Sequence, residues 1–378
     1  MKNKERKYTE QDLKDMQAFP LERKIQISQT RILEWILKNG KDHVAVSFSG
    51  GKDSTVLLDL VRRVEPSIPA IFSNTGLEFP EVRQFALSKP NVIEVRPEIN
   101  FMQVLRMFGY PVISKDTATQ IEAARRNDAK RSILSKKRML GKATFTGHNG
   151  EELESFFNKE KYLPLCQLPI PISVKCCENI KEKPIAKYQK THELLPIVGT
   201  MASESRRRKQ GWMLNGCNAF DIASPRSAPL SFWTEQDVLN YIRQYNIEIA
   251  SVYGQVIPEA SQSVKARNGV CLKCAGRQRT GCIFCAYGAH LEKKELGETR
   301  FQQLARTHPK LYDYCMRGGE WIDNPAYDPT TPVYDPECPE WVNWNPKKIW
   351  VANSKGLGYK VMLDMIASVY GKDFIPYD

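Results

Sequence analysis

The clearest chemical feature of the chain is a short glycine-rich segment, Ser49, Gly50, Gly51, Lys52, Asp53 and Ser54. Two adjacent glycines allow a tight turn and a close approach of a ligand to the backbone. The apolar run HVAVSF precedes the segment and the helical pattern STVLLDLVRRV follows it. The free N–H groups and positive dipole end of that helix would face the turn. The segment is therefore predicted to bind a phosphate or sulfate group, although its spacing is not that of a Walker A motif.

Cysteines form the second chemical feature. Four of the ten lie close together as two Cys-x-x-Cys pairs, Cys271 with Cys274 and Cys282 with Cys285. Four thiolates suit tetrahedral zinc or a four-iron cluster. The N-terminus MKNKERKYTEQDLKD lacks the apolar core of a secretory signal, and no apolar run is long enough for a membrane span. We therefore expect a cytoplasmic protein with no membrane partner, in which clustered cysteines bind metal rather than form disulfides.

Alternating strand and helix patterns must position these groups. HVAVSF, PAIFSN, NVIEVRP and HELLPIVG predict strands, and helical patterns separate them, including one over residues 20–39 and one that Thr234 caps. The alternation predicts an α/β fold with a doubly wound, mainly parallel sheet and a Cys-rich, less regular C-terminal region. The predicted parts are an N-terminal helical extension (1–40), a nucleotide-binding α/β domain (41–250) and a Cys-rich metal-binding and C-terminal region (251–378).

The charge is strongly basic. The chain has 55 Lys and Arg against 43 Asp and Glu, a net charge of +12. This favours a polyanionic partner such as nucleic acid or an anionic substrate, and the alternative is that the basic residues only keep the protein soluble. Two basic runs, AARRNDAKRSILSKKR and Arg206–Lys209, could follow a nucleic-acid backbone.

Several segments resemble a known family. SGGKDS resembles the pyrophosphate-binding motif of the N-type ATP pyrophosphatases, which belong to the adenine nucleotide alpha hydrolase superfamily. FSNTGLEFPEV, CCENIKEKPI, GTMASESRRR, PLSFWTEQDVLNYI and TGCIFC resemble segments of the phosphoadenosine phosphosulfate (PAPS) reductase family, in the family's order, from about residue 44 to 290. The double cysteine is similar to that of the adenylylsulfate reductases.

The resemblance implies roles for individual residues. The SGGKDS loop should hold the phosphates of ATP or of an adenylyl sulfonucleotide. The expected partners of the adenine or ribose are Ser73 and Asn74, and Glu78 would support Mg²⁺ if ATP is the substrate. The residues expected across the cleft are Gly199, Glu204 and Arg206. The candidate catalytic residues are Lys52, Asp53 and Arg206.

The resemblance also implies a ligand set for a 4Fe-4S cluster, with zinc as the alternative metal. The set consists of Cys176, Cys177, Cys282 and Cys285. The local quartet, in which Cys271 and Cys274 replace the double cysteine, is the alternative. Under the first choice those two cysteines would form a redox pair or a second site.

One expected motif is missing. The reductases carry a nucleophilic cysteine in a Glu-Cys-Gly-Leu-His or Glu-Cys-Gly-Ile-His motif near the C-terminus, and the nearest string here is DPECPEW, with Cys338 before a proline. The first interpretation is therefore an ATP pyrophosphatase that adenylates a nucleic acid or small molecule and acts as a sulfurtransferase with a sulfur-donor protein. The alternatives are an adenylylsulfate or phosphoadenylylsulfate reductase with an electron-donor protein, and a non-enzymatic nucleotide- or redox-sensing module that binds nucleic acid.

Overall fold

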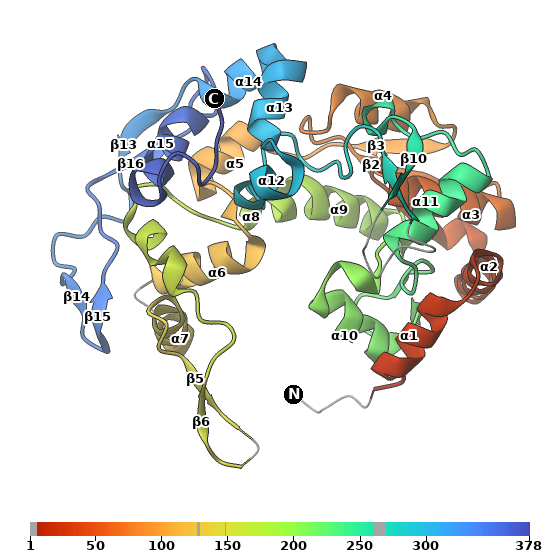
Figure 1. Cartoon of the computed structure of the whole chain (residues 1–378), viewed down its shortest axis with the longest axis horizontal. Helices are drawn as coiled ribbons and strands as arrows, with labels where there is room; N and C mark the ends of the chain where they lie inside the picture. The colour runs from red at the N-terminus through yellow and green to blue at the C-terminus, as the bar shows by residue number, and fades with distance from the viewer. Residues whose placement is uncertain (1–5, 127–128, 148, 261–269) are drawn as a thin grey trace. The chain divides into compact units, whose positions relative to one another are not determined.

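The computed structural model describes residues 6–126, 129–147, 149–260 and 270–378 (Figure 1). The chain forms two compact units. Unit 1 comprises Met1–Glu98 and Lys181–Cys282, and unit 2 comprises Ile99–Ile180 and Ile283–Asp378. These units differ from the three consecutive parts suggested by the sequence, because the chain leaves unit 1 after Glu98, returns at Lys181 and leaves again after Cys282.

Unit 1 is built on a six-stranded sheet with the order β3-β2-β1-β7-β9-β8. Its strands are β1 (Val44–Phe48), β2 (Ala70–Ser73), β3 (Val92–Val95), β7 (Leu195–Val198), β8 (Asn218–Ala219) and β9 (Arg226–Ser227). All neighbours pair in parallel except β8 and β9. The central strand β1 is almost wholly buried, as expected where helices cover both faces of a parallel sheet. The predicted α/β fold with a mainly parallel sheet is confirmed.

The helices of unit 1 include those that the sequence predicted over residues 20–39, after the glycine turn and after Thr234. They are α1 (Glu10–Ala18), α2 (Leu21–Asn39), α3 (Lys52–Val64), α4 (Pro80–Ser88), α9 (Lys183–Thr191), α10 (Arg206–Asn215) and α11 (Glu235–Gln244). The hydroxyl of Thr234 caps α11 as predicted, and the reciprocal partner is Asp237, whose carboxylate accepts from the Thr234 N–H at 2.8 Å. Lys24 of α2 contacts the same carboxylate at 2.6 Å, so a buried ion pair joins α2 to α11. A hairpin of β10 (Val256–Ala260) and β11 (Val270–Cys274) packs near α11.

Unit 2 consists of helices and short two-stranded ribbons. Its helices are α5 (Phe101–Phe108), α6 (Lys115–Ala124), α7 (Ala129–Met139), α8 (Lys175–Cys177), α12 (Ala289–Leu296), α13 (Arg300–Thr307), α14 (Pro309–Met316) and α15 (Tyr359–Tyr370). Its strand pairs are β4 (Val112–Ile113) with β12 (Ala286–Tyr287), β5 (Thr144–Thr146) with β6 (Glu152–Glu154), β13 (Glu320–Asp323) with β16 (Lys348–Val351), and β14 (Tyr334–Asp335) with β15 (Cys338–Val342). In the part of the chain that is described, no helix has the length and apolar composition needed to cross a bilayer.

Candidate functional site

In the SGGKDS segment, Ser49–Gly51 form the turn between β1 and α3, and Lys52–Ser54 begin α3. The turn lies at the carboxyl edge of the sheet, where ligands of open α/β folds bind. Gly50 has a φ of +71°, and a Cβ there would lie 2.9 Å from both the Cγ1 and the backbone oxygen of Val82. Both the backbone conformation and the available space therefore require glycine at this position. Gly51 is extended and forms the N-cap of α3.

Side-chain hydroxyl groups form hydrogen bonds with the backbone and side chains of this turn. The Ser49 and Ser54 hydroxyls are 2.9 Å apart, and the Gly51 N–H donates to Ser49 Oγ at 3.3 Å. The Lys52 N–H donates to the Tyr253 hydroxyl at 3.2 Å. These side chains can rotate, so the N–H groups at the start of α3 are available to an anion once the hydroxyls move.

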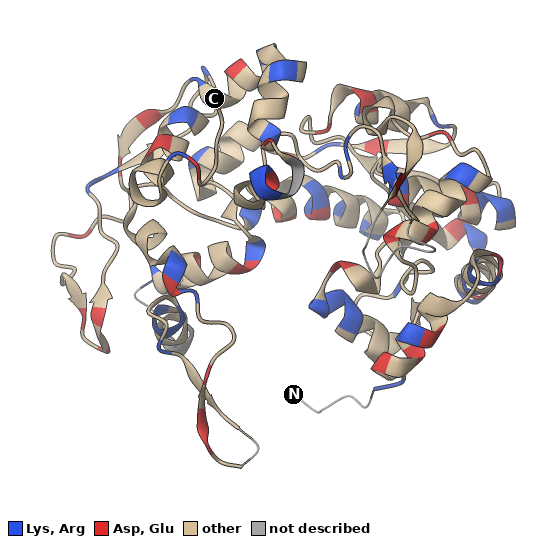
Figure 2. Cartoon of the chain, viewed as in Figure 1, with Lys and Arg blue, Asp and Glu red and all other residues tan. Residues whose placement is uncertain are grey.

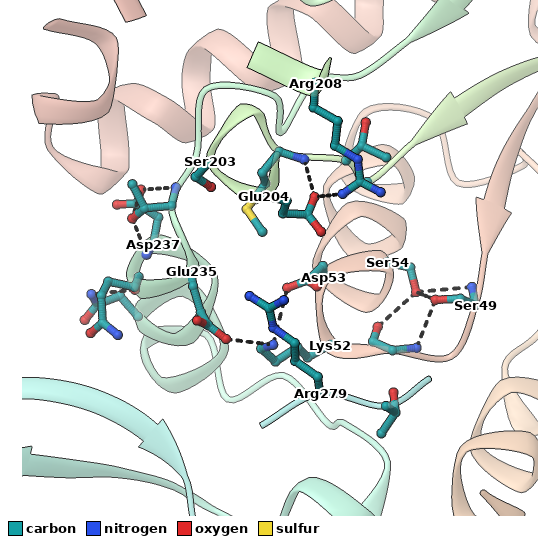
Figure 3. Close-up of a pocket in the computed structure, with 18 of the residues that line it drawn as sticks. Ser49, Lys52, Asp53, Ser54, Ser203, Glu204, Arg208, Glu235, Asp237 and Arg279 are labelled. Atoms are coloured by element: carbon teal, nitrogen blue, oxygen red, sulfur yellow. Dashed lines mark hydrogen bonds and ion pairs between the residues drawn. The ribbon is translucent and has the colours of Figure 1, made fainter. Parts of the chain in front are cut away.

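A cavity of about 1240 Å³ within unit 1 borders the turn (Figure 3). Its walls include Ser49, Gly51, Lys52, Asp53, Ser54 and Gly199. Further walls come from residues 200–208, from the start of α11 and from the segment that contains Arg279. The volume exceeds the roughly 300–1,000 Å³ of common small-molecule pockets. The cavity is therefore large enough for a ligand of nucleotide size.

The side chain of Lys52 is almost fully buried, and it lines this cavity with its ammonium group. Its Nζ lies 2.9 Å from the backbone oxygen of Gln278, 3.1 Å from Glu235 and 3.8 Å from Asp53. Burial opposes the charge, but the two carboxylates outweigh it and raise the pKa of Lys52 above its usual value. Lys52 is therefore a protonated ammonium group that converges with Asp53 and Glu235 in Figure 3.

The charged form of Asp53, unlike that of Lys52, is disfavoured by its surroundings. Burial raises the pKa of its carboxyl group, Lys52 opposes this shift, and the nearby carboxylates of Glu204 and Glu235 add to it. The folded protein thus disfavours the negative charge of Asp53 in the empty cavity. A bound cation or a hydrogen-bond donor would relieve that cost.

Ser73 and Glu78 border a second, smaller hollow of about 90 Å³ beside the turn, where β1 and β2 end. The Glu78 carboxylate accepts from the N–H and the hydroxyl of Thr75 at 3.1 and 2.7 Å. Asn74 donates instead to Glu94 at 2.6 Å. Two of the three residues expected near the adenine, ribose or Mg²⁺ therefore face a cavity, and their roles stay predictions.

Three arginines border the cavity, Arg208, Arg243 and Arg279, and the expected Arg206 is not among its walls. Arg206 and Arg208 are both exposed on α10, and Arg208 pairs with Glu204. The role expected of Arg206 stays a prediction. Glu235 and Tyr253 were missed as cavity residues, although Glu235 follows the predicted helix cap directly.

Cys271 and Cys274 lie on β11, in an extended strand. Residues three apart in a strand point to opposite faces and are separated by about 10 Å along the strand. Cys274 is buried, with Lys52 among its neighbours, while Cys271 is partly exposed. This geometry does not bring the first Cys-x-x-Cys pair together on one ion, as the local quartet would require.

Unit 2 brings three of the other predicted ligands toward one short backbone segment, residues 110–113. Within this segment, Tyr110 forms a parallel β-bridge with Ile172, and Val112 pairs in parallel with Ala286. The double cysteine follows Ile172 closely, and Cys285 directly precedes Ala286.

Three of these thiols influence the same phenol, that of Tyr287. Burial raises the pKa of Tyr287, and the thiols of Cys176, Cys285 and Cys177 raise it further. The Sγ atoms of the double cysteine are 4.0 Å apart. The fourth predicted ligand, Cys282, is the last residue of unit 1. Within the described ranges, no three His, Cys, Asp or Glu side chains are grouped closely enough to hold a metal ion.

Cys338, the nearest counterpart of a reductase nucleophile, is a buried thiol on β15 of unit 2. Its N–H donates to the Asp335 carboxylate at 3.0 Å. Burial, followed by the charge of Asp335, raises the pKa of the Cys338 thiol. A shielded thiol with a raised pKa is a poor nucleophile.

The two basic runs differ in their surroundings. Figure 2 shows basic residues at the start of α10, where Arg206 and Arg207 are exposed. In the longer run, Arg125 is half-buried and donates to four carbonyl groups of residues 165–170, and Lys136 is buried against Asp335. These two side chains support unit 2, so they cannot follow a nucleic-acid backbone as predicted. Residues 127 and 128 and the side chains of 129–131 lie outside the described part of this run.

The chain belongs to the family of the phosphoadenosine phosphosulfate reductase domain, whose model matches residues 43–286. It is 48% identical over 52 residues to a phosphoadenosine 5'-phosphosulfate reductase of Xylella fastidiosa, a match covering 14% of this chain and 22% of that one. It is 31% identical over 84 residues to an adenosine 5'-phosphosulfate reductase of Bacillus cereus, covering 21% and 36%. The chain thus matches only a minor part of the length of these relatives.

Two solved structures are similar at low identity. A phosphoadenylyl-sulfate reductase from Candida auris, in a phosphate complex, has 13% identity and a TM-score of 0.32, covering 64% of this chain and 90% of that one. An FMN adenylyltransferase from Candida glabrata has 13% identity and a TM-score of 0.33, covering 68% and 74%.

Proposed function

We propose that this protein is an ATP pyrophosphatase that adenylates an acceptor and then acts as a sulfurtransferase. The observation that carries the proposal is the SGGKDS turn, with the buried cation of Lys52, at the edge of a cavity of about 1240 Å³. The turn and Lys52 would hold the pyrophosphate of ATP, and the hollow beside Ser73 would receive part of the nucleoside. The rest of the cavity would receive the acceptor.

The reaction needs a nucleophilic oxygen on the acceptor. It attacks the α-phosphorus, the bond from that phosphorus to the bridging oxygen breaks, and pyrophosphate leaves with the electron pair. Lys52 and the N–H groups of the turn would stabilise the negative charge that develops on the leaving group. Asp53 would support Mg²⁺ on the phosphates, a role also proposed for Glu78, and the cation would offset the cost of burying the Asp53 carboxylate. The outer sulfur of a persulfide on a donor protein then attacks the activated atom of the acceptor, and AMP leaves with the electron pair. A second thiol of the donor protein attacks the inner sulfur of the resulting mixed disulfide, so the acceptor keeps the outer sulfur as a thiolate and the donor becomes a disulfide.

A nucleic-acid acceptor is supported by the net charge of +12 and by the exposed arginines of α10 beside the cavity. A 4Fe-4S cluster would supply one-electron or sulfur-binding chemistry and would be held by Cys176, Cys177, Cys282 and Cys285. The set consists only of thiols, which suits iron–sulfur chemistry. The reducing cytoplasm is the proposed location.

Release of pyrophosphate from ATP by anaerobically purified protein tests this function, with and without tRNA or DNA. Lys52→Met should abolish the release. Lys187→Met is the matched control, because Lys187 is an exposed lysine of unit 1 paired with Glu98 at 2.6 Å. A protein that binds ATP but never cleaves it with any acceptor would overturn the proposal.

The second candidate is a sulfonucleotide reductase, favoured by the similarity of the chain to the two bacterial reductases. It would bind adenylylsulfate or its 3′-phosphorylated form in the same cavity, with Cys338 as candidate nucleophile and thioredoxin as electron donor. Sulfite production from either compound would support it. Equal production by Cys338→Ser would exclude that thiol, whose burial argues against this candidate.

A further inference from the structure

A segment of unit 1 that forms neither helix nor strand lies against the phosphate turn. It comprises Ala275–Thr280, directly after β11, and we call it the strap. The backbone oxygen of Gln278 accepts from Lys52 Nζ at 2.9 Å. The Thr280 hydroxyl lies 2.5 Å from the Tyr253 hydroxyl, which in turn accepts from the Lys52 N–H at 3.2 Å. The strap therefore uses, directly or through Tyr253, the two kinds of donor that Lys52 would offer to a phosphate.

The three N–H donors of the Lys52 ammonium group face three oxygen partners among the described residues. These partners are the Gln278 carbonyl at 2.9 Å, Glu235 at 3.1 Å and Asp53 at 3.8 Å. Asp53 belongs to α3 and Glu235 to α11, so regular helices carry both carboxylates. The Gln278 carbonyl is neutral, and a phosphate oxygen makes a stronger, charge-assisted bond to an ammonium group. The partner that a phosphate replaces most readily is therefore the carbonyl of the strap.

The backbone of the strap is hydrogen-bonded to the short turn that carries Tyr253. The Gly276 N–H donates to the Tyr253 carbonyl at 2.8 Å, and the next N–H, that of Arg277, donates to the Val252 carbonyl at 3.0 Å. The two backbones approach so closely that a Cβ at Gly276 would lie 2.5 Å from the Val252 oxygen. A side chain at this position would therefore push the strap away from the turn.

The side chain of Gln278 fastens the strap to the end of β11. Its amide group donates to the Cys274 carbonyl at 2.6 Å and accepts from the Cys274 N–H at 3.2 Å. This reciprocal pair of hydrogen bonds holds the Gln278 backbone oxygen against Lys52 Nζ. Because one side chain makes both bonds, a single substitution can loosen the strap while it leaves the residues of the phosphate turn in place.

We propose that the strap is an autoinhibitory segment, which competes with the phosphates of a nucleotide for Lys52 and is displaced when they bind. This inference rests on the phosphate site of the proposed function. A ligand that must open the strap loses part of its binding free energy in doing so. Its apparent affinity is therefore reduced by the fraction of chains in which the strap is open, and loosening the strap should restore affinity.

Calorimetric titration of the full chain with inorganic pyrophosphate tests the competition. Gln278→Ala should bind pyrophosphate about 2- to 10-fold more tightly than the wild type, because the closed strap loses its side-chain hydrogen bonds. Gln244→Ala is the matched control, since Gln244 is an exposed glutamine of unit 1 that donates to Glu22 at 3.3 Å. The control should bind pyrophosphate with the affinity of the wild type.

Gly276→Ala loosens the strap through its backbone and leaves Gln278 unchanged. The clash with the Val252 oxygen destabilises the closed position, so this variant should bind pyrophosphate about tenfold more tightly. Gly211→Ala, on α10, is the control, because among the described residues the space around its added Cβ is open. Thermal unfolding of each variant shows that the compared proteins are folded.

Hydrogen–deuterium exchange, followed by mass spectrometry, reports the movement itself. Saturating pyrophosphate should speed exchange over residues 275–280, because the N–H groups of Gly276 and Arg277 lose their carbonyl partners. The same ligand should slow exchange at the start of α3. A phosphate site without a moving strap would slow exchange in both segments, so the direction of the change over the strap distinguishes the two cases.

Unchanged or weaker pyrophosphate binding by Gln278→Ala overturns the inference, as does slower exchange of the strap when pyrophosphate binds. In either case the proposed function stands if the wild type still releases pyrophosphate from ATP. A wild-type chain that binds no pyrophosphate, together with variants that bind none, overturns the inference and the phosphate site at once.

Discussion

Replacing Gly50 with alanine tests the geometry of the phosphate turn most sharply. A left-handed backbone costs alanine about 1–2 kcal/mol. The added Cβ would also lie 2.9 Å from the Val82 backbone oxygen, which cannot rotate away. Overpacking of this kind costs about 1–3 kcal/mol. The total of about 2–5 kcal/mol must appear either as lost stability, if the turn keeps its shape, or as lost affinity, if it relaxes.

Two assays measure the loss of stability and the loss of affinity separately. Urea unfolding gives the change in the free energy of unfolding, and calorimetric titration with pyrophosphate and ATP gives the change in affinity. If the turn relaxes, a loss of 2 kcal/mol or more corresponds to an affinity about 30-fold weaker or worse.

Gly40→Ala is the matched control, since Gly40 also has a positive φ, +86°, but its Cβ would make only an ordinary contact at 3.5 Å. It should lose about 1–3 kcal/mol of stability and no affinity. If Gly50→Ala left both quantities unchanged, the reasoning about the turn would be refuted.

Three other substitutions probe separate groups. Lys52→Met should weaken ATP binding about 10- to 100-fold, the worth of a charge-assisted hydrogen bond, and calorimetry showing wild-type affinity would contradict this. Asp53→Asn should stabilise the empty protein near pH 7 and have no effect below about pH 4. Burial raises the pKa of the Asp53 carboxyl in the folded protein, so ionising Asp53 above its unfolded pKa lowers the stability of the folded state. Urea unfolding of both proteins across this pH range measures whether the substitution stabilises or destabilises. Arg125→Lys should cost about 2–4 kcal/mol because a lysine cannot reach all the carbonyl groups. Its nucleic-acid affinity, measured by fluorescence anisotropy, should not change.

Local signals made much of the fold predictable from sequence. The strand, glycine turn and helix around Lys52 are consecutive in the chain, and each has its own periodicity. The cap at Thr234 could also be predicted, and its reciprocal partner is Asp237. The doubly wound sheet follows from the repeated alternation of such local units.

Contacts between distant segments were not predictable. Glu235 pairs with Lys52, and Tyr253 accepts from its N–H, only because the sheet brings these segments together. Which arginines border the cavity also depends on how distant segments fold together. The two interleaved units depend on where the chain crosses between them, which no local pattern records.

The most direct measurement of the central claim is the fate of ATP labelled at the α-phosphate, incubated with the anaerobic protein, Mg²⁺, a persulfide donor and candidate nucleic acids. The account predicts labelled AMP and an equal amount of pyrophosphate, both lost in Lys52→Met. Intact ATP under all these conditions, with sulfite formed instead from adenylylsulfate or its 3′-phosphate and thioredoxin, would contradict it.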